Sequence, residues 1–128
     1  MLYLDTSAAV KLLLAEEESL AIRAYVNDKD WACSALLRTE LVRAVVRVDP
    51  SVVPRALDLL LQPRLMAISM RVLNVAAKLD PPGLRSLDAI HLASALELRD
   101  ELTAFVAYDD RLLAAASALG MPVASPSA

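Results

Sequence analysis

The chain has 128 residues, which is the usual size of one domain (residues 1–128) and leaves too little sequence for two stable cores. Hydrophobic residues make up 57% of it and its net charge at pH 7 is −3, so the composition excludes intrinsic disorder. Aromatic residues are only 4%, which leaves little surface for stacking on bases and argues against RRM and OB-type nucleic-acid binders. The single cysteine, Cys33, excludes an intrachain disulfide framework and a multi-cysteine zinc site.

Short apolar runs alternate along the chain with longer segments in which apolar residues recur at helical spacing. In chain order, the runs predict strands at residues 1–4, 31–33, 64–69, 103–107 and 122–124. The periodic segments predict helices at residues 8–13, from 16–18 to about 28, 35–48, 51–61, 70–79, 87–99 and 109–119. The expected N-caps are hydroxyl side chains, namely Thr6 or Ser7, Ser34 and Ser86. Gly120 is expected to close the last helix.

No segment is typical of a targeting or membrane-spanning sequence. Residues 1–15 contain Asp5 and Lys11 and lack the basic start of a secretory signal. The longest uncharged stretch, residues 112–128, is interrupted by Gly120 and by prolines and is too short to span a bilayer as a helix. We therefore expect a cytoplasmic protein that does not enter a membrane.

The order of the predicted elements determines the expected architecture. Strands that are separated by helices cannot form hairpins, so they are expected to run parallel through right-handed crossovers. Helices then cover both faces of the sheet. The sequence thus predicts an α/β protein, a three-layer α/β/α sandwich with a mostly parallel central sheet. In such open sheets, ligands bind beyond the carboxyl ends of the strands.

Acidic residues fall where such a site is expected. Asp5 directly follows the first strand, and Asp109 follows the strand at 103–107 after one residue, so both are expected at the same edge of the sheet. Glu40 and Asp88 lie within predicted helices. Each of these two has a plain structural alternative, since Glu40 could pair with a nearby arginine and Asp88 could complement the dipole of its helix.

Four carboxylates that converge on one cleft would repel one another strongly unless a divalent cation neutralised them. Hard oxygen ligands favour Mg²⁺ or Mn²⁺. Mg²⁺ is usually held by a few carboxylates together with substrate phosphate, so such a site suits phosphodiester hydrolysis. The acidic residues therefore indicate metal-dependent chemistry on a phosphodiester.

Four segments, in this order and spacing, resemble the PIN-domain family and specifically the VapC toxins of bacterial toxin–antitoxin pairs. They are Tyr3-Leu4-Asp5-Thr6-Ser7-Ala8, then Thr39-Glu40-Leu41 with Arg43-Ala44, then Leu84-Arg85-Ser86-Leu87-Asp88-Ala89-Ile90-His91-Leu92-Ala93, and Phe105-Val106-Ala107-Tyr108-Asp109-Asp110-Arg111-Leu112. The third is the most distinctive, and the order and spacing of all four make the match specific.

The resemblance implies a Mg²⁺- or Mn²⁺-dependent endoribonuclease, the toxin of a VapBC-type pair, that cleaves transfer or ribosomal RNA. It also implies a homodimer neutralised by a cognate VapB-type antitoxin, with operator DNA bound only through that antitoxin. In the family, Asp5, Glu40, Asp88 and Asp109 occupy the acidic metal positions. We expect Asp5 and Asp88 to be the principal ligands, Glu40 to bind through water, and Asp109 to support a second cation or the attacking water, with Ser7 as a supporting donor.

Three arginines and the one histidine lie close to these acids in sequence. Arg43, Arg85 and Arg111 could neutralise phosphate or form salt bridges. His91 lies three residues after Asp88 on one helix face, so the two could form a ligand pair. The alternative for His91 is a packed, hydrogen-bonded core histidine.

One position departs from the family pattern. Ala107 stands two residues before the fourth acid, where the family usually has Thr or Ser, which puts the second metal position in question. The neighbouring Asp109 and Asp110 both offer a carboxylate, and alignment to the Asp-x-Arg-Leu pattern favours Asp109. Ala107 also supports a rival interpretation, a catalytically weak PIN domain that acts mainly as an antitoxin-binding or operator-regulating partner.

Overall fold

A five-stranded sheet forms the centre of the computed structural model, which describes residues 1–127. In chain order its strands are β1 (Leu2–Leu4), β2 (Trp31–Ser34), β3 (Arg64–Met66), β4 (Ala104–Val106) and β5 (Val123–Ala124). They lie in the order β3-β2-β1-β4-β5, and every neighbouring pair runs parallel. The predicted parallel sheet is confirmed. After β3 the chain crosses back over β1, so the strand order reverses beside β1, where ligands of such sheets bind.

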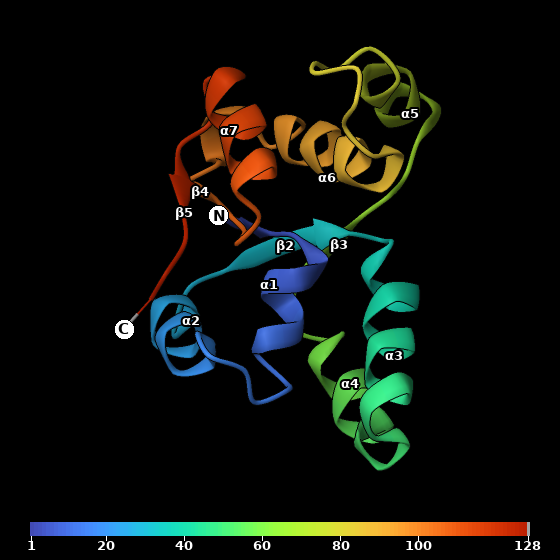
Figure 1. Ribbon diagram of the computed structural model, residues 1–128, viewed down its shortest axis with the longest axis vertical. Helices are drawn as coiled ribbons and strands as arrows, with labels where there is room; N and C mark the ends of the chain where they lie inside the picture. Colours follow the sequence, from blue (N-terminus) through green and yellow to red (C-terminus); the bar gives the residue numbers. More distant parts are fainter. Residues whose placement is uncertain (128) are drawn as a thin grey trace.

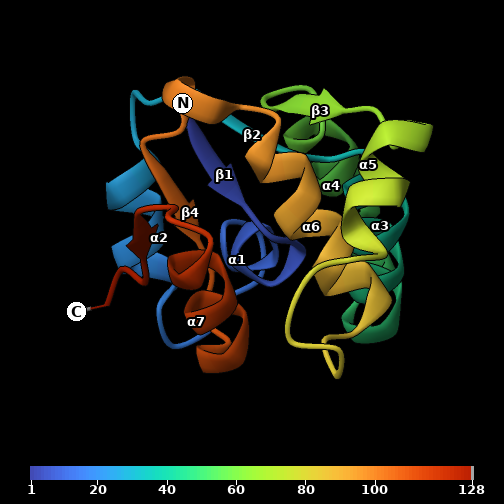
Figure 2. The same ribbon diagram turned by 90° about the horizontal axis from the view of Figure 1, so that it is seen from above.

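Helices cover both faces of this sheet. On one face lie α1 (Thr6–Lys11), α2 (Ser19–Val26), α3 (Leu37–Val48) and α4 (Val53–Leu59), and on the other lie α6 (Ser86–Leu96) and α7 (Asp110–Ala118) (Figure 1). The remaining helix, α5 (Met70–Ala76), packs on α6 (Figure 2). Single 3-10 turns, η1 (Pro50–Val52) and η2 (Arg99–Glu101), precede α4 and β4. This is the expected three-layer α/β/α sandwich.

The alternation of side chains along the strands builds two separate cores. On β1, Leu2 and Leu4 are buried under the first group of helices, whereas Tyr3 between them is buried under α6 and α7. On β4, Val106 and Phe105 divide in the same way. Because successive side chains of a strand point to opposite faces and both faces are covered, these strands are apolar throughout.

The predicted cap of the first helix is wrong. Asp5, rather than Thr6 or Ser7, is the N-cap of α1, and its side chain accepts a hydrogen bond from the backbone N–H of Ala8. The backbone of Asp5 is still extended as it leaves β1, which is the conformation an N-cap requires. Thr6 and Ser7 already belong to the helix, so their hydroxyl groups are available for other partners.

The other two predicted caps also differ. Ser34 ends β2 and its Oγ accepts from the N–H of Leu36, which is the residue that precedes α3. Ser86 is the first residue of α6, and Arg85 before it has no capping hydrogen bond from its side chain. At both helices the serine is therefore not the N-cap. The residue that directly precedes the helix has the extended or turn backbone and occupies that position instead.

Several predicted strands are too long. The strand expected at 64–69 ends at Met66, because Ser69 caps α5 by accepting a hydrogen bond from Val72 N–H at 3.1 Å. The expected helical stop at Gly120 is confirmed, since this glycine has φ of +85° after α7.

In the described part of the chain, no helix is both long enough and apolar enough to cross a membrane.

Candidate active site

The four acidic residues singled out from the sequence line one cavity at the carboxyl edge of the sheet. Asp5 leaves β1 and Asp109 follows β4, while Glu40 projects from α3 and Asp88 from α6. The cavity has a volume of about 240 Å³, and its other lining residues are Thr6, Ser7, Arg85, Leu87, His91 and Leu112. The fold thus brings together side chains from four distant segments of the chain.

Asp5 is the most buried of the four, with 5% of its surface exposed. The Ser7 hydroxyl lies 2.9 and 3.0 Å from its two carboxylate oxygens, and the N–H of Ala8 donates to Oδ1 at 2.9 Å. Burial raises the pKa of Asp5, and the hydrogen bond from Ala8 only partly offsets this effect. A buried carboxylate held mainly by donors of its own turn has a strong physical need for a positive partner.

Glu40 is half-buried and takes its hydrogen bonds from across the cavity. Thr6 Oγ1 donates a short hydrogen bond to Glu40 Oε1, and His91 Nε2 lies 3.3 Å from the same oxygen. Burial acts to raise the pKa of Glu40, but the hydrogen bonds from His91 and Thr6 outweigh it and leave this pKa below its ordinary value. Among the residues described, Glu40 makes no ion pair with Arg43, so the plain alternative for this acid is not what the fold adopts.

His91 is buried, with 3% of its surface exposed, and both of its ring nitrogens face protein groups. Nδ1 lies 2.8 Å from the Tyr3 hydroxyl, and Nε2 faces Glu40 and Thr6. The fold adopts the packed alternative rather than a ligand pair with Asp88, because both ring nitrogens already have protein partners. The histidine is packed and hydrogen-bonded, and its carboxylate partner is Glu40.

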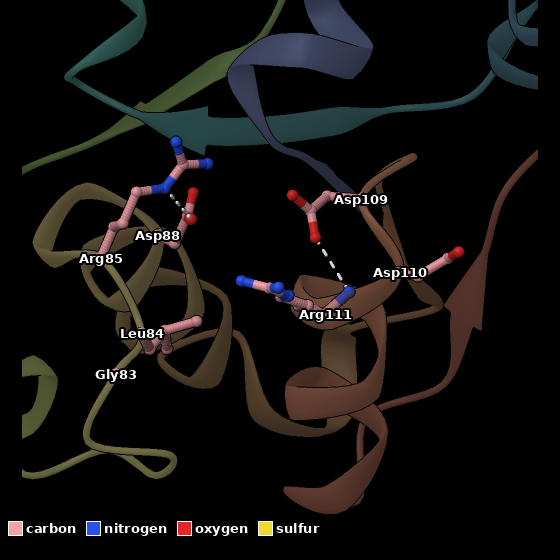
Figure 3. A pocket seen from close by; sticks show the side chains of 7 residues that line it. All are labelled: Gly83, Leu84, Arg85, Asp88, Asp109, Asp110 and Arg111. Atoms are coloured by element: carbon pink, nitrogen blue, oxygen red, sulfur yellow. Dashed lines mark hydrogen bonds and ion pairs between the residues drawn. The ribbon is translucent and has the colours of Figure 1, made fainter.

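Asp88 and Asp109 occupy the more open side of the site. Arg85 Nε lies 3.1 Å from Asp88 Oδ2, in an ion pair whose arginine side chain is 78% exposed. Asp109 caps α7, since its Oδ1 accepts from the N–H groups of Arg111 at 2.9 Å and Leu112 at 3.1 Å. The carboxylate of Asp109 points toward Asp88, whereas that of Asp110 points away from both (Figure 3). Of the two neighbouring acids, only Asp109 lines the acidic cavity.

A wider, open cavity of about 520 Å³ adjoins the acids. Its lining residues are Gly83, Leu84, Arg85, Asp88, Asp109, Asp110 and Arg111. Arg85 and Asp88 lie on one side of this space and Asp109 and Arg111 on the other, with the Arg111 side chain directed toward the side of Asp88 (Figure 3). Carboxylates and guanidinium groups thus lie side by side, which is an arrangement that can hold both a cation and a phosphate.

The donor set fits a hard divalent cation. All four acids supply carboxylate oxygens to one cavity, and such oxygens are the ligands Mg²⁺ and Mn²⁺ prefer. Within residues 1–127, however, no three acidic, histidine or cysteine side chains are arranged around a common point as a metal site would require. Each carboxylate instead bonds to a donor of its own chain: Ser7, Thr6, Arg85 and the backbone of α7. These local hydrogen bonds partly offset the repulsion between the carboxylates that share the cavity.

Ala107 lies in the core rather than at the cavity wall. It is fully buried and belongs to the cluster that includes Phe105 and Leu112. Its carbonyl accepts a hydrogen bond from the Ser125 hydroxyl at 3.0 Å. The position where the family usually has a hydroxyl is thus filled by a packed methyl group.

Thr6 and Tyr3 are site residues whose partners could not be identified from the sequence. The position of Thr6 directly after Asp5 was a usable signal, because residues adjacent to a strand-end acid share its edge of the sheet. Tyr3 gave no such signal, since an aromatic residue inside an apolar strand is typical of a core.

Comparison with known proteins agrees with this geometry. Residues 2–118 match the family model of the PIN domain. The chain belongs to the PIN-domain family. Within it, the chain is of the VapC type: it is 42% identical over 134 residues to Ribonuclease VapC47 of Mycobacterium tuberculosis, covering 100% of this chain and 98% of that protein. It is also 42% identical over 131 residues to Ribonuclease VapC35 of the same species, covering 98% of this chain and 97% of that protein.

Solved structures share the fold at much lower sequence identity. The Mycobacterium tuberculosis toxin VapC20, described as cleaving the Sarcin-Ricin loop, superposes with a TM-score of 0.75 at 16% identity, over 98% of this chain and 100% of that chain. VapBC2 from Rickettsia felis, bound to a DNA fragment from its promoter, gives a TM-score of 0.71 at 14% identity, over 99% of this chain and 100% of that chain. These matches establish the shared fold.

Proposed function

We propose that this protein is a Mg²⁺- or Mn²⁺-dependent endoribonuclease, the toxin of a VapBC-type pair. The observation that carries the proposal is the convergence of Asp5, Glu40, Asp88 and Asp109 on one cavity at the carboxyl edge of the sheet. Support comes from the full-length relatives, which are named ribonucleases, and from VapC20, which is described as a Sarcin-Ricin loop cleaving toxin.

Each acidic residue of the cavity has its own role in this proposal. Asp5 and Asp88 would hold the principal cation, Glu40 would bind it through water, and Asp109 would support a second cation or orient the attacking water. When bound, the cation lowers the pKa of water and neutralises charge on the phosphate. Ser7 keeps the carboxylate of Asp5 oriented, through its hydrogen bonds to both oxygens.

The substrate chain would lie in the wider cavity. Arg85 and Arg111, on its two walls, would neutralise the phosphates that flank the scissile bond. Single-stranded or looped RNA suits this arrangement, because two arginine side chains in an open cleft can contact backbone phosphates and do not reach into the groove of a duplex. We take transfer or ribosomal RNA as the substrate class.

The partners proposed for this chain are a cognate VapB-type antitoxin, a second copy of the chain, and operator DNA bound only through the antitoxin. Support comes from VapBC2 and FitAB, two solved relatives of this fold that are described as bound to DNA fragments. On the surface of α3, Val46 is 49% exposed and Val48 68% exposed, and such apolar residues provide contact area for a protein partner. We place the protein in the cytoplasm, where RNA and an antitoxin are both available.

The test is incubation of the purified protein with total RNA in the presence of Mg²⁺, Mn²⁺ or EDTA. Discrete fragments that require a divalent cation and disappear with EDTA are expected. Asp109→Asn should lose the activity, whereas Asp110→Asn, at the neighbouring acid that does not line the acidic cavity, should keep most of it. Fragments that persist in EDTA, or equal activity of the two variants, would contradict the proposal.

The second candidate is a catalytically weak PIN domain that acts through its antitoxin or operator complex, and Ala107 is the observation that favours it. It predicts no fragments with any cation in the same assay. Binding to the antitoxin would then be the remaining activity to measure.

A further inference from the structure

A chain of hydrogen bonds runs from the sheet to the acidic cavity. The backbone N–H of Ser34, at the end of β2, donates to the Tyr3 hydroxyl at 3.0 Å. The Tyr3 hydroxyl lies 2.8 Å from His91 Nδ1, and His91 Nε2 faces Glu40 Oε1 at 3.3 Å. The Thr6 hydroxyl donates to the same oxygen of Glu40 and lies 3.2 Å from His91 Nε2. Glu40 is thus the end point of a network that starts in the backbone of the sheet.

The chemistry of Glu40 fixes the position of one proton on the His91 ring. An ionised carboxylate has only acceptor oxygens, so His91 Nε2 must carry a proton in order to bond to Glu40. The Tyr3 hydroxyl accepts from Ser34 N–H and lies within hydrogen-bond distance of His91 Nδ1, so it fixes the direction in which the ring points. The proton on Nε2 is the one that the bond to Glu40 requires.

The start of this chain is rigid. Tyr3 is fully buried, and its ring stacks on Phe105 with centroids 5.4 Å apart and planes 7° apart. The His91 ring meets the Tyr3 ring edge-on at 6.0 Å and 72°. Because close-packed aromatic rings in a core have little rotational freedom, Tyr3 can hold the imidazole in one orientation. Glu40, by contrast, is only half-buried and is oriented by what donates to it.

We propose that His91 is a positioning residue for this site: its Nε2–H, with the ring held in place by Tyr3, holds the carboxylate of Glu40 toward the acidic cavity. The inference rests on the proposed function, in which Glu40 serves the cation. It assigns to the histidine a role in which it touches neither metal nor RNA. Outer partners that orient a ligating group typically change metal affinity or activity by about 10–100-fold when they are removed.

Nuclear magnetic resonance of the imidazole tests the proton assignment without any activity measurement. His91 is the only histidine of the chain, so its ring nitrogens are identified without further assignment. We expect Nε2 to carry a proton in the metal-free protein, and a shift of its Nε2–H signal in Glu40→Gln. A ring protonated on Nδ1 alone, or a signal unchanged by Glu40→Gln, would overturn the inference.

Calorimetric titration with Mn²⁺ and steady-state cleavage of RNA test the consequence. His91→Leu should bind Mn²⁺ about 10–100-fold more weakly and lower kcat by a similar factor, with little change in KM for the RNA. His91→Gln, whose amide nitrogen reaches the place of Nε2, should recover part of both losses. In a Glu40→Gln background, His91→Leu should cost nothing further, since residues that act as a unit are not additive.

Leu92→Val is the matched control for lost packing. It removes volume from the core on the same helix and touches none of these hydrogen bonds, so it should lower the unfolding temperature without weakening Mn²⁺ binding. Wild-type Mn²⁺ affinity and kcat in His91→Leu, or the same loss in Leu92→Val, would overturn the inference. If the wild-type chain cleaves no RNA with any cation, the proposed function fails, and the imidazole spectra still decide whether His91 holds Glu40.

Discussion

The carboxylate of Asp5 accepts a hydrogen bond from the backbone N–H of Ala8 at 2.9 Å, so the most buried acid of the site is also the N-cap of α1. The same residue therefore serves the helix and the proposed chemistry. These two roles can be separated, because a cap requires an acceptor oxygen and the proposed metal site requires a negative charge.

Asp5→Asn and Asp5→Ala are expected to differ in stability but not in activity. Asparagine keeps the cap and removes a charge that burial disfavours, so Asp5→Asn should unfold at the wild-type temperature or above it. Alanine leaves the N–H of Ala8 without its acceptor and should cost about 1 kcal/mol. Both variants should lose RNA cleavage. Thermal unfolding and the cleavage assay, run on the same preparations, measure the two roles, and an active Asp5→Asn would contradict the assignment.

Arg85→Ala is expected to weaken RNA binding while leaving the fold intact. Its ion pair with Asp88 is on the surface, where such pairs are worth about 0–1 kcal/mol, so stability should change little. Loss of one phosphate contact should lower the slope of log affinity against log salt by about 0.7. Fluorescence anisotropy with an RNA oligonucleotide, in the inactive Asp5→Asn background, gives the affinity at several salt concentrations.

Arg71→Ala is the control for that measurement. Arg71 is similarly exposed and pairs with Glu97 at 3.4 Å, but it lies on α5, away from the two cavities of the site. Its removal should leave the RNA affinity and the salt slope as they are. An equal effect of both variants would mean that Arg85 acts only through the net charge of the protein.

Ser51→Ala is expected to change how stability depends on acid. The Ser51 hydroxyl at 2.7 Å and its N–H at 3.1 Å both donate to Asp49, and these hydrogen bonds hold the pKa of Asp49 below its ordinary 3.8. A pKa lowered in the folded state adds stability above the unfolded value, and this stability is lost as pH falls through the folded value. Ser51→Ala should therefore be less stable than wild type at neutral pH, and the difference should shrink below about pH 4. Urea unfolding at a series of pH values measures it, and a pH-independent difference would contradict this account.

Gly120→Ala is expected to destabilise the end of α7. Gly120 has φ of +85°, and a Cβ placed there meets open space, so the cost is conformational alone. For an L-residue in the left-handed region that cost is about 1–2 kcal/mol. Gly83→Ala is the matched control, because it also meets open space and its φ is not in the left-handed region. It should be neutral or slightly stabilising. Chemical unfolding of the two variants distinguishes strain at Gly120 from a general intolerance of alanine.

The N-caps of the helices show how much of the structure local sequence patterns could predict. Apolar periodicity located the helices, but the hydroxyl residues expected to start them were displaced by Asp5, Leu36 and Arg85. Several residues near a helix start can supply a cap, and the backbone conformation of the preceding strand or loop decides among them. The local sequence pattern therefore predicted which helices and strands form, but it predicted their first and last residues only to within a few positions.

The acidic residues of the candidate site could be predicted from the sequence, whereas the hydrogen bonds that orient them could not. Asp5 and Asp109 could be placed at one edge of the sheet because both follow strands that the order of elements makes parallel. His91 lay near Asp88 in sequence, yet its partner is Glu40, which is 51 positions away. Only the packing of α3 and α6 at the edge of the sheet decides that pairing.

The order of strands and helices, the parallel sheet and the position of Asp5 and Asp109 at its edge could thus be predicted from the sequence itself, because hydrophobic periodicity and the residues after each strand are local properties. The tertiary structure alone decided that Tyr3 contacts His91, 88 positions along the chain. It also puts Asp109, the acid that the alignment favoured, rather than Asp110 in the acidic cavity. The physical reason is that a hydrogen bond requires its donor and acceptor to be within about 3 Å of each other, and distances on that scale between remote segments are fixed only when the helices pack against the sheet.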